Sequence, residues 1–181
     1  DRTKHDRYWF RMKHDQQLWY GFNAKLDIDY VSDMDYLRTF TDGFAEFDST
    51  DAAFEGMFGR DLDGETDYIR KNSLLVTKNW FSYSLNMKAL WYDNIKARQI
   101  DIDDTTLQTL PSVEFFAARQ KIAADFGLYY KMDSEFTSFY RQDTTATKVT
   151  GKRADVHPIF YYPIKFGKSF FLEPYAGVRG T

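Results

Sequence analysis

The segment Leu18–Tyr30, LWYGFNAKLDIDY, decides the fold predicted for this chain. Its even positions are apolar or aromatic, whereas the odd positions from 23 to 29 are polar or charged. Successive side chains of a strand point to opposite faces, so this pattern predicts one long strand with an apolar and a polar face. At about 3.3 Å per residue and a tilt of about 40°, Tyr20 to Tyr30 span roughly 25 Å, the height of the lipid-facing band of an outer-membrane barrel. Strands of soluble sheets usually have about 5–6 residues, so a membrane barrel is favoured.

The composition of the 181-residue chain agrees with this choice. Aromatic residues make up 19% of the sequence, but no run approaches the ~18 apolar residues of a transmembrane helix. There is no cysteine, which excludes disulfides, thiolate catalysis and cysteine metal sites. Neither terminus looks like a natural chain end. We therefore expect residues 1–181 to be part of a single barrel domain of a longer protein.

Seven further segments show strand patterns. They are Arg7–Lys13, Tyr68–Lys78, Phe81–Trp91, Thr105–Ala118, Ile122 to about Tyr140, Lys152–Pro163, and Lys168 onward, in addition to Leu18–Ser32. The predicted connections are short at 14–16, 78–80, 119–120 and 164–167, and long at 33–67, 93–104 and 141–151. Short turns at one end and long loops at the other are typical of outer-membrane barrels. The prediction is an all-β, antiparallel, up-and-down transmembrane β-barrel, here an incomplete segment of about eight strands, without any helix longer than about two turns.

The long connection 33–67 is the most acidic part of the chain. It holds eleven acidic residues against Arg38 and Arg60. We expect an irregular, solvated loop on the outer side of the membrane. The run Asp61–Asp67 resembles a calcium loop only faintly, because Asn72 stands where the bidentate Glu is needed. No metal site is predicted.

The alternation assigns side chains to the two faces of the sheet. The residues predicted to face lipid are Tyr20, Phe22, Leu26, Ile28, Phe81, Tyr83, Leu85, Phe126 and Leu128. The residues predicted to face the lumen are Arg11, Lys13, Lys25, Asp27, Asn86, Lys88, Asp125 and Lys131. A hydrated wall needs such polar residues in any case. Alternatively, Lys and Arg would contact the anionic head groups of an amphiphile that passes along this face.

Enzymatic chemistry has little support in the sequence. His5, His14 and His157 lack metal-binding spacing, and the GxSxG, P-loop and GxGxxG motifs are absent. We therefore expect neither an enzyme nor a cofactor. The prolines near the C-terminus are unexpected in strands. If Phe166 centres the last hairpin, Pro158 and Pro174 face each other.

Several motifs resemble the barrel domain of the LptD family, the lipopolysaccharide-assembly proteins of the outer membrane. They are WFRMKH (Trp9 to His14), DYVSDMDYLRTF (Asp29 to Phe40), LPSVEF (Leu110 to Phe115), RADVHPIFYYP and FLEPYAGVRGT. The cluster Ser32, Asp33, Tyr36 and Phe40 after a long strand is the closest similarity. The spacing of Pro158, Pro163 and Pro174 is a further trait of the family. The resemblance extends over nearly the whole chain and implies a structural role for these seven residues.

The resemblance implies a function in lipopolysaccharide transport. A very large barrel, of which this chain is the N-terminal part of the C-terminal domain, would insert lipopolysaccharide into the outer leaflet of a Gram-negative outer membrane. The implied partners are lipopolysaccharide, an LptE-like plug lipoprotein and periplasmic lipopolysaccharide-bridge proteins, and no nucleic acid. Two alternatives remain at this stage. One is a small self-closing eight-stranded porin or lipid-modifying enzyme, and the other is a soluble lipocalin-like carrier.

Overall fold

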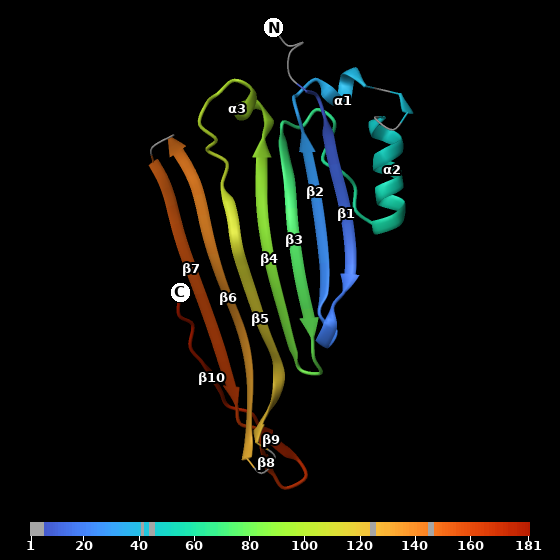
Figure 1. The fold of residues 1–181 in the computed structure, drawn as a ribbon. Helices are drawn as coiled ribbons and strands as arrows, with labels where there is room; N and C mark the ends of the chain where they lie inside the picture. The colour runs from blue at the N-terminus through green and yellow to red at the C-terminus, as the bar shows by residue number, and fades with distance from the viewer. Residues whose placement is uncertain (1–5, 41, 44–45, 124–125, 145–146) are drawn as a thin grey trace.

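The computed structural model describes residues 6–40, 42–43, 46–123, 126–144 and 147–181. Its main feature is an antiparallel sheet of eight strands in the order β1-β2-β3-β4-β5-β6-β7-β10 (Figure 1). These strands are β1 (Trp9–Gln17), β2 (Asn23–Val31), β3 (Ile69–Asn79), β4 (Tyr83–Asn94), β5 (Gln108–Ala123), β6 (Phe126–Thr144), β7 (Thr147–Tyr161) and β10 (Tyr175–Gly177). The remaining elements are η2 (Trp19–Gly21), α1 (Tyr36–Thr39), α2 (Phe47–Phe58), α3 (Ile95–Gln99), β8 (Ile164–Phe166) and β9 (Phe170–Leu172).

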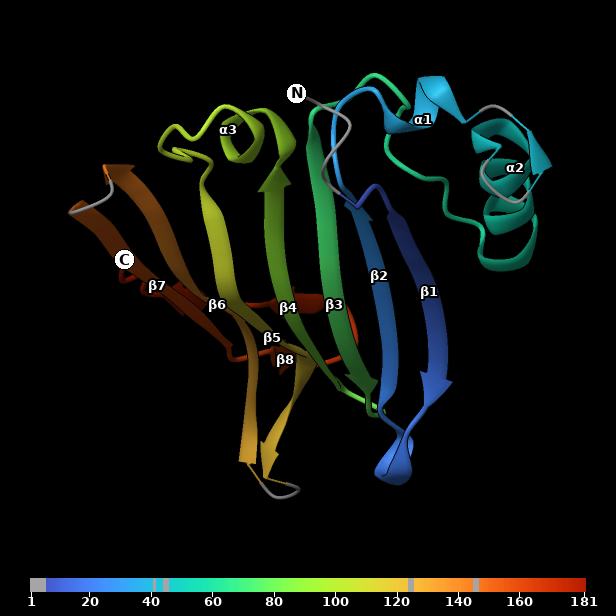
Figure 2. The ribbon, with the colours of Figure 1, turned by 45° about the horizontal axis from the view of Figure 1, so that its top comes forward.

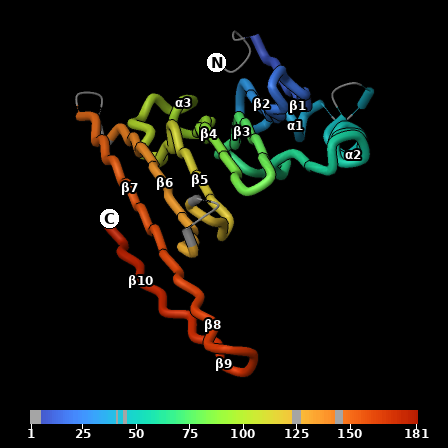
Figure 3. Tube along the Cα trace, turned by 90° about the horizontal axis from the view of Figure 1, so that it is seen from below, coloured from blue at the N-terminus to red at the C-terminus, as the bar shows by residue number. Residues whose placement is uncertain are grey.

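The predicted up-and-down antiparallel topology is confirmed. Strands that follow one another in sequence pair in space, apart from the small β8–β9 hairpin between β7 and β10. The sheet is open, since β1 and β10 lie at opposite edges (Figures 1 and 3). The eight-stranded porin and lipocalin alternatives require a sheet that closes on itself, and the described strands do not close. None of the helices in the described part of the chain has the length and apolarity needed to span a bilayer.

The segment Leu18–Tyr30 is not one strand, which corrects the first prediction. Residues 18–22 form the hairpin turn, in which Tyr20 and Gly21 have φ angles of 57° and 76°. Because both adopt the left-handed region, the chain reverses here, and β1 continues to Gln17 through the predicted break at 14–16. The side chain of Tyr20 is 82% exposed at this turn rather than on a strand face.

The connections also differ from the prediction. The region 33–67 contains α1 and the twelve-residue helix α2, so it is not wholly irregular, and the limit of two helical turns was wrong. The predicted turn at 119–120 is strand, because β5 extends to Ala123. The predicted loop 141–151 is mostly strand as well, since β6 ends at Thr144 and β7 begins at Thr147. Threonine, which is frequent in this region, favours extended backbone once a partner strand is present.

The last hairpin is centred on Lys168 rather than Phe166. The pairs Tyr161↔Tyr175 and Ile164↔Leu172 share this centre, although the ladder is interrupted between them. The interruption contains Pro163 and Pro174, and prolines lack the N–H that a ladder requires. The eighth strand of the main sheet is therefore short. In this register Pro174 lies opposite Tyr162, whose N–H donates to the Pro174 carbonyl at 3.0 Å.

Pro158 faces Val178, and not Pro174 as predicted. Its carbonyl accepts from the Val178 N–H at 3.2 Å. Because the N–H and C=O of a strand residue point to the same side, the missing donor also faces the C-terminal segment. Val156 and Gly180 nearby exchange both of their bonds. Pro158 thus removes one hydrogen bond from the β7 edge and none from the β6–β7 ladder.

Candidate functional site

The candidate site is the polar face of the sheet. The cross-strand register shows which side chains share a face, since directly paired residues point to the same side. The polar face contains Arg11, Lys13, Lys25, Asp27, Ser73, Thr77, Ser84, Asn86, Lys88, Ser112, Glu114, Lys131, Asp133, Glu135, Asp155 and His157. The apolar face contains Phe10, Met12, Leu26, Ile28, Leu74, Val76, Tyr83, Leu85, Met87, Val113, Phe115, Met132, Phe136, Val156 and Phe160.

Most of the predicted face residues separate in this way. Leu128 follows the alternation of β6 on the apolar side. Tyr20, Phe22 and Phe81 lie in hairpin turns rather than within strands. Asp125 lies outside the described residues, and so does the side chain of Phe126. Which face meets lipid and which meets substrate stays a prediction.

The segment between β2 and β3, residues 32–68 and hereafter the insert, folds against the polar face of β1 and β2. The indole of Trp9 stacks on Phe47 of α2 with ring centroids 5.9 Å apart. Trp9 also joins a buried cluster with Val31, Leu37 and Leu62. Apolar contacts therefore fix the insert to one end of the sheet. Figure 2 shows its helices α1 and α2 at this end, beside β1.

A single arginine fixes the other end of the insert to the wall. The guanidinium of Arg60 donates to both carboxylate oxygens of Asp27 at 2.8 to 3.1 Å. It also donates to Asp15, at 2.6 and 3.1 Å. These bonds, first those to Asp15 and then those to Asp27, raise the pKa of Arg60. Sequence reasoning missed Arg60, although it is one of only two cations in the acidic segment.

The insert covers part of the predicted lumen surface. Arg11 lies 3.9 Å above the Trp9 ring and donates to Thr50 of α2 at 3.3 Å. The side chain of Lys13 is only 5% exposed, and its ammonium lies 3.7 Å from Asp27. Arg11, Lys13 and Asp27 are therefore engaged within the protein.

The remaining candidates lie outside this covered region. Lys25 is 49% exposed and lies 3.6 Å from Asp15. Lys88 is exposed on β4 between Leu75 and Ser112. Lys131 lies 3.1 Å from Asp133, and its ammonium is 5.4 Å from the Phe116 ring. Asn86 donates to Glu114 at 3.3 Å. This open part of the polar face carries both signs of charge.

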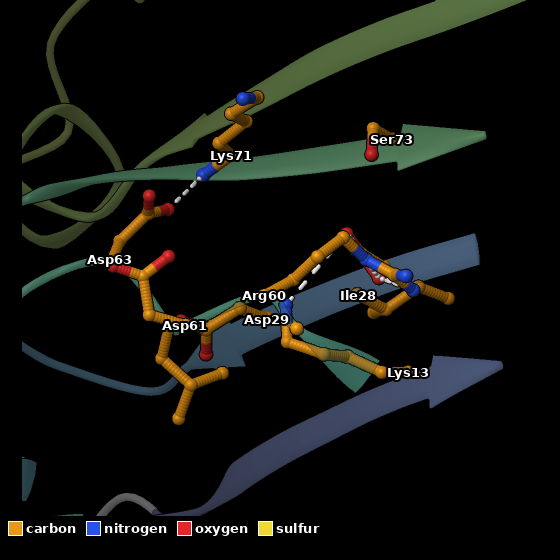
Figure 4. Close-up of a pocket in the computed structure, with 11 residues that line it drawn as sticks. Lys13, Ile28, Asp29, Arg60, Asp61, Asp63, Lys71 and Ser73 are labelled. Carbon is orange, nitrogen blue, oxygen red and sulfur yellow. Dashed lines mark hydrogen bonds and ion pairs between the residues drawn. The ribbon is translucent and has the colours of Figure 1, made fainter. Parts of the chain in front are cut away.

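A pocket of about 250 Å³ lies between the insert and β1 to β3 (Figure 4). It is lined by both cations and carboxylates, including Lys13, Arg60, Asp27 and Asp63. Asp63 accepts from the backbone N–H of Lys71, so it holds the insert against β3. In the part of the chain that the structure describes, no group of three or more acidic or histidine side chains could hold a metal ion.

Below the insert lies a buried polar network. Asp29 accepts from the Trp9 indole at 2.7 Å and from Arg70 at 3.3 Å. The ladder between β2 and β3 stops at Asp27↔Ser73, and the Asn72 side chain takes over by accepting from the Asp29 N–H at 2.9 Å. The Nε of Arg70, which is 1% exposed, has no partner among the described atoms. The network therefore fixes the position where the strands separate to admit the insert.

The motif residues Asp33, Tyr36 and Phe40 converge on Arg7, and the Ser32 hydroxyl donates to Asp33 at 2.8 Å. The Arg7 guanidinium donates to both Asp33 oxygens at 2.8 Å and lies over the rings of Tyr36 and Phe40. Burial raises the pKa of Asp33, but the bonds from Arg7, Ser32 and the Asp35 N–H outweigh it, so the pKa lies below its usual value. This arrangement fits a structural role at the end of β2.

The motifs and the sheet are explained by one comparison. The family model described as LptD: LPS transport system D matches residues 5–181. The chain belongs to the LptD family. No curated protein matches the chain. The LptD family is an outer-membrane family of lipopolysaccharide transport proteins rather than an enzyme family. Membership accounts for the strand-rich sheet with one apolar face, because a sheet that stands in lipid needs such a face.

Proposed function

We propose that this chain forms part of the barrel wall of the translocon that inserts lipopolysaccharide into the outer leaflet of the outer membrane. Family membership supports the transport role. The observation that carries the proposal is the separation of a charged face from an apolar face across the strands of one open sheet. The apolar face meets lipid, and the polar face lines the interior of the barrel.

Within this wall, the lipopolysaccharide path follows the open half of the polar face. The insert covers Arg11, Lys13 and Asp27, so the head groups pass along β4 to β6 instead. Lys88 and Lys131 are two of the cations there that a phosphate group can reach. An ammonium is a compact point charge that binds phosphate without fixed geometry, which suits a ligand in motion.

The partners follow from the same proposal. An LptE-like plug lipoprotein fills the interior of the complete barrel, and periplasmic bridge proteins deliver lipopolysaccharide to it. The open edges of the sheet support a role as one part of a larger barrel, because unpaired backbone groups each cost several kcal/mol in lipid.

Photo-crosslinking of the intact parent protein tests the path. A crosslinking residue at Lys88 is compared with one at Ala89, the next residue on the opposite face. The protein is reconstituted in phospholipid vesicles free of lipopolysaccharide, because lipopolysaccharide in the outer leaflet would otherwise label both positions. Lipopolysaccharide is then supplied from the periplasmic side.

The expected result is a lipopolysaccharide adduct at Lys88 and only phospholipid adducts at Ala89. A crosslinker at Lys13 is expected to capture the insert instead. Equal lipopolysaccharide labelling at Lys88 and Ala89, or labelling at neither, would leave the polar face as a hydrated wall without a transport role.

A further inference from the structure

A second pocket, of about 710 Å³, lies at the end of the sheet that carries α1 and α3 (Figure 1). Three segments that are distant in sequence line it: residues 6–8 before β1, residues between 32 and 39 after β2, and residues 98–100 at the end of α3. Pockets of about 300–1,000 Å³ are of the size that holds small ligands. This pocket is therefore a candidate ligand site apart from the open half of the polar face.

Two arginines hold the walls of this pocket in place. Arg98 donates to Asp93 at 3.0 Å and to two backbone carbonyls at the end of β2, so it ties α3 to that strand. Arg7, from the segment before β1, is fixed by its two bonds to Asp33. Binding to walls that are already fixed costs little conformational entropy.

The same arginines keep donors for a ligand. A guanidinium has five N–H donors. Within the described residues, the bonds of Arg98 leave its Nε–H and one Nη1–H, and those of Arg7 leave both Nη1–H groups. The Gln99 side-chain oxygen accepts from the Met34 N–H at 3.5 Å, and its NH₂ group donates to no described atom. The pocket thus offers several positioned N–H donors from two separate segments.

The charges around the pocket favour a hydroxylated ligand over a phosphate. Asp33 and Asp93 neutralise the two arginines. The carboxylates of Asp6 and Asp35 line the pocket as well. An anionic phosphate would be repelled by these carboxylates. A hydroxyl both donates and accepts, so it can bridge a guanidinium and a carboxylate.

Two further side chains give the pocket an apolar surface. Tyr8 is 46% exposed and Ile100 is 53% exposed, and both line the pocket. The Tyr8 phenol lies close enough to Arg98 to interact with it electrostatically, so its ring stands beside the remaining donors. A sugar ring presents C–H groups on its faces and hydroxyls around its rim. Aromatic and aliphatic side chains cover the C–H groups, and the polar lining meets the hydroxyls.

We infer that this pocket is a saccharide-binding site. The sugar ring packs on Tyr8 and Ile100. Its hydroxyls accept from Arg7, Arg98 and Gln99. The location of the pocket on the outer surface of the membrane rests on the proposed function, which places the long connections outside, whereas the chemistry of the pocket does not. The saccharide comes either from lipopolysaccharide or from another glycan of the cell surface.

Saturation-transfer NMR on the intact parent protein, in a detergent without sugar groups, tests the site. The probes are the polysaccharide released from lipopolysaccharide by removal of lipid A, a neutral glucose oligosaccharide, and inorganic phosphate as a competitor. Ile100→Ser is expected to weaken saccharide binding about 3- to 10-fold, because apolar contact with the ring is lost. The matched control is Ile102→Ser, since Ile102 is 55% exposed but does not line the pocket, and this variant is expected to leave binding unchanged.

The two saccharides distinguish the sources. Binding of the lipopolysaccharide-derived polysaccharide alone assigns the site to that source, and binding that includes the glucose oligosaccharide assigns it to surface glycans more generally. No saturation transfer to either saccharide, equal effects of Ile100→Ser and Ile102→Ser, or displacement of the saccharide by phosphate would overturn the inference. Crosslinking at Lys88 reports on the transport path separately, so either proposal can fail while the other stands.

Discussion

Replacement of Arg60 by alanine is expected to release the insert from the wall while leaving the sheet intact. Arg60 is 22% exposed and makes charge-assisted bonds to Asp15 and Asp27. Bonds of this kind contribute about 1.5–3 kcal/mol when partly buried. Asp15 is more exposed than Asp27, so its share is reduced to under about 1 kcal/mol by solvent screening. Lys13 and Lys25 remain as partial partners for the two carboxylates.

The expected net loss is therefore about 2–3 kcal/mol in the free energy that keeps the insert docked. This corresponds to a roughly 30- to 150-fold larger open fraction. Hydrogen exchange of peptides that cover Phe47–Phe58, in the parent protein in detergent, measures this fraction directly. Peptides from β4 and β5 serve as the internal reference and are expected to keep their exchange rates.

Two variants sharpen the comparison. Arg38→Ala removes the same charge from the insert, but Arg38 is exposed and makes no ion pair among the described residues, so it is expected to change exchange less than threefold. Arg60→Lys keeps the charge and loses the planar fork, so most of the Arg60→Ala effect is expected. If Arg60→Ala and Arg38→Ala have equal effects, the reasoning about the Arg60 bonds is refuted.

Three further predictions concern the insert and the β1 residue on which it packs. The bonds from Arg7 lower the pKa of Asp33, so the stability that Asp33 gives to the α1 region is complete above the ordinary carboxyl pKa of about 3.9 and is lost as pH falls below that value. Proteolysis of the α1 region is expected to accelerate at this low pH. The variant Asp33→Asn is expected to behave at neutral pH like the acidified protein. Trp9→Phe removes the donor to Asp29 and is expected to lower the unfolding free energy by about 1–3 kcal/mol in detergent, since a buried carboxylate oxygen loses its partner; an unchanged denaturation midpoint would contradict this. Gly59 ends α2 with φ of 62°, and a Cβ added there would meet no other atom within 4 Å, so Gly59→Ala is expected to cost about 1 kcal/mol from backbone strain alone, seen as faster exchange of the last turn.

The topology and the two faces could be predicted because period-two patterning is local. Each strand carries its own alternation, so Leu26 and Lys25 are assigned to opposite faces without knowledge of their neighbours. The ends of strands are less well marked. The apolar pattern continues through Leu18 and Phe22 into the turn, and only Gly21 indicates that the chain reverses there.

Helix α2 was missed although the sequence contains a signal for it. Phe47, Phe54 and Phe58 have helical spacing, and Gly59 follows as a typical end residue. The density of acidic residues favoured an irregular loop instead. Acidic composition indicates solvent exposure on one side of a segment, and it does not exclude a helix whose other side packs against Trp9.

The contacts of the insert could not be predicted from local patterns. Arg60 meets Asp15 and Asp27 only because a connection between β2 and β3 folds back across the face of β1. Similarly, Arg70 and Asp29 become partners where two strands separate. Such pairs depend on tertiary geometry, and a single sequence gives no information about which acid a distant arginine will meet.

Paired quenching at Lys25 and Leu26 tests most directly whether this sheet is a membrane wall with two different faces. Spin labels are placed at each position of the parent protein in lipid, one residue apart on β2 and on opposite faces. A lipid-dissolved relaxation agent is expected to act strongly on the label at Leu26, and a water-soluble agent on the label at Lys25. If the lipid-dissolved agent reaches both labels equally, the sheet does not separate lipid from an aqueous interior.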